Sequence, residues 1–136
     1  MSIWLLKTEP DEYSLADLQR DGVAEWDGVT NAVAQRNMRS IAQGDICVVY
    51  HTGNERSAVG LASVARGPYP DPTDPRGKRV WVDLRAGERL ERPVTLSELR
   101  AEPAYADSPL LRMGRLSVVP LAQEQLDAIL RLANEK

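Results

Sequence analysis

The chain has 136 residues, of which 43% are hydrophobic and 27% are charged, which is typical of one globular domain spanning residues 1–136. Its net charge of −3 argues against bulk binding of duplex DNA, because proteins held mainly by phosphates are usually basic. No apolar run approaches the ~20 residues of a membrane span, and the N-terminus lacks the features of a signal peptide. Because Cys47 is the only cysteine, no internal disulfide can form, and we expect a cytoplasmic protein without a membrane partner.

The first third of the chain predicts strands alternating with helices. Residues 3–7 are apolar and include a tryptophan, which indicates a strand. Residues 14–22 open with a Ser-x-x-Asp capping box and stop at a glycine, and residues 31–44 open with an asparagine N-cap and end near another glycine. Residues 45–52 contain a run that is apolar on both faces, which predicts a strand in the centre of a sheet.

The middle of the chain predicts two further strands. Residues 59–65 pair back after a Gly-Asn turn, and residues 80–84 alternate between apolar and polar side chains. Between them, residues 67–72 hold three prolines, and we expect a loop because proline donates no ladder hydrogen bond.

The last third predicts short helices around one strand. A second capping box opens residues 95–101, and a proline in the first turn favours a helical turn at residues 108–112. Residues 116–119 form a short strand, and residues 122–133 carry the apolar stripe of an amphipathic helix. Five or six strands in irregular order with short helices favour an α+β fold with a curved sheet or small barrel.

Trp26 opens the stretch on which the functional hypothesis depends. An Asp-Gly turn follows it, and Asn31 then caps the next helix. A tryptophan close to a helix N-terminus can hold a planar polar ligand. The alternative is a core tryptophan followed by a capped helix.

Several catalytic chemistries lack their residues. His51 is the only histidine, so that one Cys and one His cannot build a zinc site. The sequence has no Walker loop, no Gly-x-Gly-x-x-Gly and no Gly-x-Ser-x-Gly. We therefore expect no metal, no cofactor and no enzymatic activity.

Separated motifs in this chain resemble the EVE domain family. They occur in one order along nearly the whole chain: Ile3 to Pro10, Trp26 to Asn31, Tyr50 to Gly53, Ala65 to Thr73, Arg92 to Val94, and Pro109 to Val118. The resemblance implies a PUA-like fold, a curved mixed β-sheet or pseudobarrel with flanking short helices, similar to the YTH domain that reads N6-methyladenine in RNA. It further implies a non-catalytic domain that reads a modified nucleobase, chiefly a modified cytosine in DNA or else a base in RNA.

The resemblance also implies site residues. The residues expected around the base are Lys7, Thr8, Trp26, Asn31, Tyr50, His51 and Thr52. Basic residues elsewhere are candidates for the nucleic-acid backbone, with solvated surface as the alternative: Arg36, Arg39, Arg76, Lys78, Arg79 and Arg112. Thr30 and Ala32 depart from the family pattern, where Arg and Tyr or Pro are usual, and the 74–78 loop is shorter than in some members.

Two other functions stay open at this stage. One is a general PUA-like RNA-binding accessory module without preference for a modification, and the other is an ASCH-like enzyme acting on nucleosides. The expected partner is nucleic acid containing a modified base, with a weak homodimer as a further option.

Overall fold

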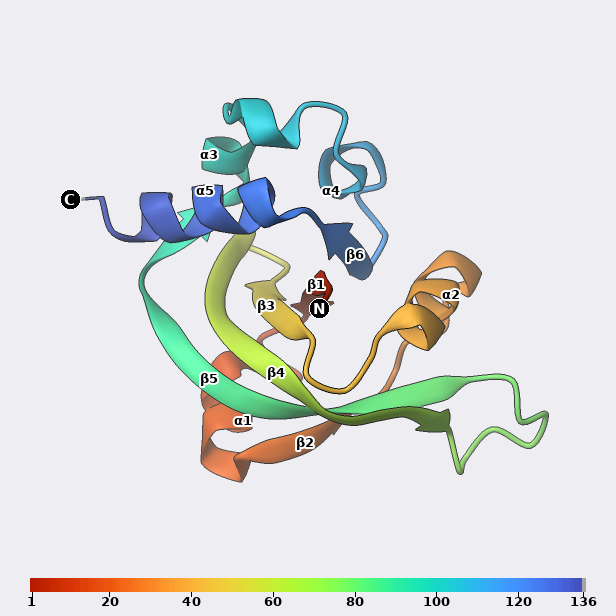
Figure 1. Ribbon diagram of the computed structural model, residues 1–136. Coiled ribbons are helices and arrows are strands. Elements are labelled where there is room, and N and C mark those ends of the chain that lie inside the picture. The colour runs from red at the N-terminus through yellow and green to blue at the C-terminus, as the bar shows by residue number, and fades with distance from the viewer. Residues whose placement is uncertain (136) are drawn as a thin grey trace.

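The computed structural model describes residues 1–135, and its six strands form one sheet in the order β2-β5-β4-β3-β1-β6. The elements in chain order are β1 (Ile3–Thr8), α1 (Leu15–Asp21), β2 (Val23–Trp26), α2 (Ala32–Ser40), β3 (Ile46–His51), β4 (Ser57–Pro70), β5 (Val80–Thr95), α3 (Leu96–Arg100), a 3-10 turn η1 (Pro103–Tyr105), α4 (Pro109–Arg112), β6 (Val118–Leu121) and α5 (Gln123–Ala133). β1 and β3 are parallel, whereas the other neighbours are antiparallel. The long strands β4 and β5 curve around β3 (Figure 1), which confirms the α+β curved-sheet prediction.

The side chains at the centre of the sheet are fully buried. β1 lies between β3 and β6, and its residues Leu5 and Leu6 are fully buried. Val48 and Val49 of β3 are buried to the same degree. Burying each such side chain contributes about 1.5–3 kcal/mol, so these two strands hold the scaffold that positions the chain on either side. Within residues 1–135, none of the helices is long and apolar enough to cross a membrane.

The predicted helix caps are present. Ser14, Asn31 and Thr95 each accept backbone N–H groups at the starts of α1, α2 and α3. The predicted end of the second helix near Gly44 is wrong, because α2 ends at Ser40 and the chain then becomes extended. Gly44 has a φ of 92° and instead makes the turn that leads into β3.

The predicted loop at residues 67–72 is also wrong, because β4 continues through Pro70. Ser63 pairs with Ile46 at the start of β3, and beyond this point β4 has β5 as its one neighbour. A proline is tolerated where one side of a strand carries no ladder. The register also shifts between Arg66 and Tyr69, which accommodates Pro68.

Three strands differ from the sequence prediction. β5 does not stop at residue 84 but runs to Thr95, paired with β4. β2, which pairs with β5, was not predicted, because Trp26 is its one fully buried side chain. β6 covers Val118–Leu121 and is therefore displaced by two residues from the predicted strand at 116–119.

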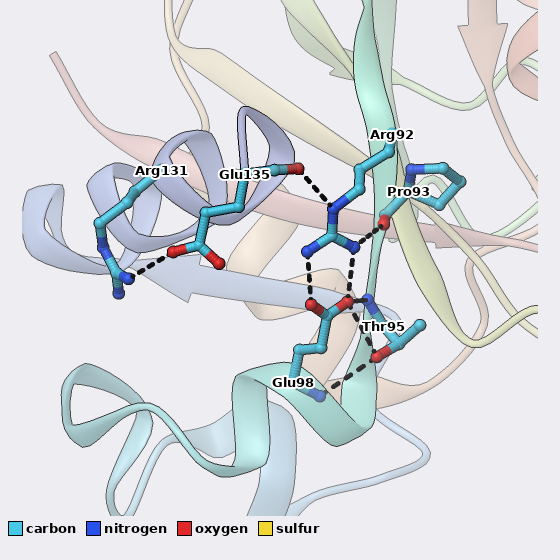
Figure 2. A network of polar contacts seen from close by, with 6 residues as sticks. All are labelled: Arg92, Pro93, Thr95, Glu98, Arg131 and Glu135. Atoms are coloured by element: carbon cyan, nitrogen blue, oxygen red, sulfur yellow. Dashed lines mark hydrogen bonds and ion pairs between the residues drawn. The ribbon is translucent and has the colours of Figure 1, made fainter.

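One ion pair joins the end of β5 to α3, and a hydrogen bond extends the contact to the residue that follows α5 (Figure 2). The Arg92 guanidinium donates two hydrogen bonds to the Glu98 carboxylate, at 3.0 and 2.6 Å. The same carboxylate accepts from the Thr95 backbone N–H at 3.0 Å, and Arg92 Nε donates to the Glu135 carbonyl at 3.3 Å. This network fixes α3 and α5 against the sheet, on the side of the molecule away from β2 (Figure 1).

Candidate functional site

A pocket lies at the end of the sheet where β1 and β2 stop. It has a volume of about 730 Å³, which is within the range of small-molecule sites. It is lined by the end of β1, the following loop, β2, the turn after β2, and single residues from other segments: Lys7, Thr8, Glu9, Glu12, Tyr13, Asp21, Val23, Ala24, Glu25, Trp26, Asp27, Gly28, Val29, Asp83 and Ser117. Three predicted site residues, Lys7, Thr8 and Trp26, therefore share one pocket.

Trp26 is both a core residue and part of the pocket wall. It is the last residue of β2, and 5% of its surface is exposed. Tyr13 packs edge-on against its ring, with centroids 6.3 Å apart and an interplanar angle of 82°. Trp26 therefore belongs to the core and also lines the pocket, although the sequence presented these as alternatives. Tyr13, which packs against it, lines the pocket as well.

Lys7 and Thr8 reach the pocket as the last residues of β1. Lys7 Nζ donates to the Gly114 carbonyl at 3.0 Å and lies 5.6 Å from the centroid of the Tyr50 ring. Burial lowers the pKa of Lys7 from its ordinary value. The Thr8 hydroxyl donates to the Tyr13 carbonyl at 2.7 Å, which holds the loop that carries Tyr13 over the pocket.

The pocket is strongly acidic. Lys7 is the one cation in the lining. Six lining residues carry carboxylates: Glu9, Glu12, Asp21, Glu25, Asp27 and Asp83. Hydrogen bonds from Arg20 and from the Tyr13 hydroxyl hold the pKa of Asp21 below its ordinary value. Carboxylates accept hydrogen bonds and repel phosphates. The pocket is thus suited to a group that presents N–H donors, and no cluster of residues able to hold a metal ion occurs within residues 1–135.

His51 does not line this pocket. It is buried at the end of β3, where its Nε2 accepts from the Leu15 N–H at 3.0 Å and its Nδ1 lies 3.0 Å from a Glu55 carboxylate oxygen. With both ring nitrogens engaged, the imidazole has no free position for a base edge. His51 instead anchors the first turn of α1.

Tyr50 and Thr52 also lie outside the lining. Tyr50 is buried, and the Lys7 ammonium group lies over its ring. The Thr52 hydroxyl lies 3.3 Å from the Thr8 carbonyl and 3.2 Å from a Glu9 carboxylate oxygen. Both residues therefore support lining residues and do not themselves reach the cavity.

Asn31 lines a second, smaller pocket of about 290 Å³. Its Oδ1 accepts from the backbone of Val33 and Ala34 at 2.9 and 3.0 Å, so this oxygen serves the helix cap. Gly114, whose carbonyl binds Lys7, lines this second pocket. Asn31 and Trp26 thus line two different pockets, which the contact between Lys7 and Gly114 connects.

The predicted basic residues are all exposed, and none lines the large pocket: Arg36, Arg39, Arg76, Lys78, Arg79 and Arg112. Three of them lie in the loop between β4 and β5, where the Asp74 carboxylate accepts the backbone N–H groups of all three. Arg39 of α2 donates to the Lys78 carbonyl at 3.0 Å. This loop is therefore ordered and joined to α2.

The sequence did not single out several lining residues. Tyr13 precedes the cap residue Ser14, a position where an apolar residue often packs against the helix, and this signal was available. Glu25 and Asp83 face each other across β2 and β5. No local pattern marks them, because their proximity depends on a strand pairing that the sequence did not reveal.

Comparisons with known proteins agree on one family. The model of the EVE domain matches residues 2–132. Human thymocyte nuclear protein 1 is 30% identical over 169 residues, which cover 99% of this chain and 75% of that protein. The solved structure of Rpa0253 from Rhodopseudomonas palustris has a TM-score of 0.92 at 36% identity and covers 100% of this chain and 97% of its own.

Two further structures bear on function and fold. The crystal structure of human THYN1 protein in complex with 5-methylcytosine-containing DNA has a TM-score of 0.85 at 28% identity and covers 100% of this chain and 99% of its own. An ASCH structure from Zymomonas mobilis, with a TM-score of 0.61, 14% identity and coverage of 96% and 94%, shares the fold alone.

Proposed function

This chain belongs to the EVE domain family, and we propose that it binds nucleic acid by receiving one modified base, a 5-methylcytosine type of base, in the pocket beside Trp26. The observation that carries the proposal is the convergence of Lys7, Thr8 and Trp26 on one pocket of about 730 Å³. The complex of human THYN1 protein with 5-methylcytosine-containing DNA supports the choice of ligand.

The base reaches such a pocket unstacked. Extruding a nucleotide from a duplex costs a few kcal/mol, and a single strand removes most of that cost. Contact with an aromatic ring contributes about 1–3 kcal/mol, which offsets the cost without exceeding it by much. Single-stranded or mismatched sites are therefore the preferred targets.

The carboxylates supply the preference for cytosine. The exocyclic N4 amino group of cytosine is a donor that Asp and Glu accept, whereas thymine presents an acceptor at the same position. Asp27 directly follows Trp26, is exposed, and makes no side-chain hydrogen bond within residues 1–135. We assign Asp27 as the acceptor for N4.

The methyl group adds apolar contact. Trp26 and Val29 are buried residues in the lining, and Val23 and Ala24 add apolar surface. Burying one methyl contributes about 0.8 kcal/mol, which gives a preference of a few-fold. Micromolar affinity for the free nucleoside follows from one stack, a few hydrogen bonds and this methyl contact.

Lys7, Thr8 and Trp26 are the proposed base contacts. Tyr50, His51 and Thr52 act on the site through other residues, since they hold Lys7, α1 and Glu9 respectively. Asn31 belongs to the neighbouring pocket and contacts a flanking part of the ligand in this proposal.

The three tryptophans provide the test, because each indole N–H gives one signal in a ¹H–¹⁵N spectrum. 5-Methyl-2′-deoxycytidine should shift the Trp26 signal. The Trp4 signal should stay, because Trp4 is buried and its Nε1 donates to Asp45 at 3.0 Å. Asp27→Asn should weaken the effect, whereas Asp127→Asn on the remote helix α5 is the matched control.

The outcome separates the proposal from its rivals. Equal shifts with methylated and plain cytosine in matched strands would favour a general nucleic-acid-binding module. Conversion of the nucleoside into a product would favour an ASCH-like enzyme. A Trp26 signal that stays fixed at millimolar nucleoside would refute the pocket.

A further inference from the structure

The hairpin formed by the last residues of β4 and the first residues of β5 projects beyond the body of the sheet (Figure 1). Two half-buried aromatic residues, Tyr69 and Trp81, face each other on it as a register pair. Their ring centroids are 6.3 Å apart at an interplanar angle of 80°. The Arg66 guanidinium lies over the Tyr69 ring, 4.1 Å from its centroid. The Tyr69 ring therefore contacts both Arg66 and Trp81, and the half-buried Trp81 side chain keeps part of its surface in solvent.

The Tyr69–Trp81 pair lies next to the large pocket. The Tyr69 hydroxyl donates to Asp83, and Asp83 lines the pocket two residues along β5 from Trp81. Glu25, opposite Asp83 on β2, lines it as well. A ligand that fills the pocket and continues along β5 therefore meets Trp81 next.

Acidic residues lie at the end of the hairpin next to the pocket, and basic residues lie at its tip. The pocket end carries Asp83 and Glu25, whereas the loop at the tip carries the exposed cations Arg76, Lys78 and Arg79. Arg66 of β4, which pairs with Asp83, is also exposed. A half-exposed aromatic residue next to a row of cations is the arrangement by which proteins hold single-stranded nucleic acid.

We propose that the outer face of this hairpin, formed by Arg66, Tyr69, Trp81 and the cations at its tip, binds the single-stranded segment that flanks the pocket-bound nucleotide. A neighbouring base stacks on Trp81, and Arg66 and the tip cations bind its phosphates. Tyr69 is a positioning residue, since it acts through Trp81. The proposal rests on the pocket function for the place where the strand starts, and it assigns the hairpin a separate share of the affinity.

The test compares a nucleoside with a strand on the same variants. Binding of 5-methyl-2′-deoxycytidine is followed by the Trp26 signal, and binding of a fluorescein-labelled seven-nucleotide DNA with a central 5-methylcytosine is followed by anisotropy. Trp81→Ala should weaken the strand about 5- to 150-fold, the range that one lost base stack implies, and should leave the nucleoside unaffected. Trp81→Phe keeps a ring and should restore most of the loss.

A cation variant and its control complete the design. Arg66→Ala should weaken the strand by several-fold and reduce the steepness of its salt dependence. Arg89→Ala removes an equally exposed arginine from the other half of β5 and should leave both ligands unchanged. In the wild type, the Trp81 indole signal should shift with the strand and stay fixed with the nucleoside.

Each outcome decides between the two proposals. If the nucleoside binds and Trp81→Ala binds the strand as tightly as the wild type, the hairpin proposal is overturned. If Trp81→Ala loses nucleoside and strand equally, Trp81 serves the pocket and the hairpin proposal is again overturned. If the wild type binds the strand through Trp81 but no nucleoside shifts Trp26, the pocket proposal fails and the hairpin site stands.

Discussion

Glu98→Gln should lower the stability of this protein in a way that depends on pH. The two hydrogen bonds from Arg92, together with those from the Thr95 backbone and hydroxyl, lower the pKa of Glu98 from 4.5 to about 2 (Figure 2). A pKa held this far below its ordinary value corresponds to at most ~3 kcal/mol of stabilisation. Because the side chains of Arg92 and Glu98 are 37% and 29% exposed, solvent screens the pair, and we expect about 1–2 kcal/mol.

The sign of the pH dependence follows from the direction of this change. The folded state holds Glu98 ionised more firmly than the unfolded state does, so the stabilisation is complete above the ordinary pKa of 4.5. It is lost as the pH falls toward the folded value of about 2. The difference between wild type and Glu98→Gln should therefore be largest near neutral pH and should shrink by more than half at the lower end of this window.

Urea denaturation of the two proteins at neutral and at acidic pH measures this difference. Glu91→Gln provides the control, because Glu91 is an exposed residue of the same strand and makes no side-chain hydrogen bond within residues 1–135. This control should match the wild type at both pH values. A Glu98→Gln deficit that is independent of pH would refute the reasoning, since it would assign the loss to packing and not to the ionised carboxylate.

Four further outcomes follow from the described contacts. His51→Ala should reduce the free energy of unfolding by about 2–4 kcal/mol in urea, since the buried Leu15 N–H loses its acceptor, and should leave nucleoside affinity unchanged. Gly87→Ala should cost about 1–3 kcal/mol in the same assay, because its Cβ would lie 2.7 Å from the Leu61 carbonyl oxygen. For a short single strand, the log–log salt dependence of binding should have a slope of about −1 to −3, and Arg79→Ala should weaken methylated and plain strands equally. Calorimetry should show that 5-methyl-2′-deoxycytidine 5′-monophosphate binds more weakly than the nucleoside, because the pocket carries six carboxylates and one lysine.

Local signals in the sequence predicted the elements that depend on a few neighbouring residues. Ser14, Asn31 and Thr95 cap their helices as expected, because a side-chain oxygen and an amide two or three residues later suffice for a cap. The apolar run of β3 likewise predicted a central strand, since a strand buried on both faces needs no alternation.

The elements that the sequence missed depend on distant partners. The proline-containing end of β4 forms a strand because β5 pairs with it on one side and leaves the other side free. β2 is a four-residue edge strand, and within residues 1–135 it pairs with β5 alone. A short window of sequence does not reveal which side of a strand is paired, so residues 67–72 were predicted as a loop and β2 was not predicted.

The sequence also predicted part of the candidate site and missed the rest. Lys7, Thr8 and Trp26 share a pocket, as the family resemblance implied. The resemblance placed His51 in the same site, but its two ring nitrogens are engaged by Leu15 and Glu55. Side-chain orientation of this kind depends on the first turn of α1 meeting the end of β3, which no motif in the sequence encodes.

The charge distribution gives a strand bound to this protein a direction. The acidic pocket admits a base that presents donors and repels the phosphates attached to it, so the backbone of the bound nucleotide stays at the rim. Toward the tip of the hairpin, the exposed cations are Arg66 of β4 and Arg76, Lys78 and Arg79 of the loop. A net charge of −3 is therefore compatible with the proposed binding of nucleic acid, in which the acidic pocket receives the base and the cations of the hairpin bind the strand. The separation of these two roles along one hairpin is why nucleoside and strand affinities should respond to different substitutions.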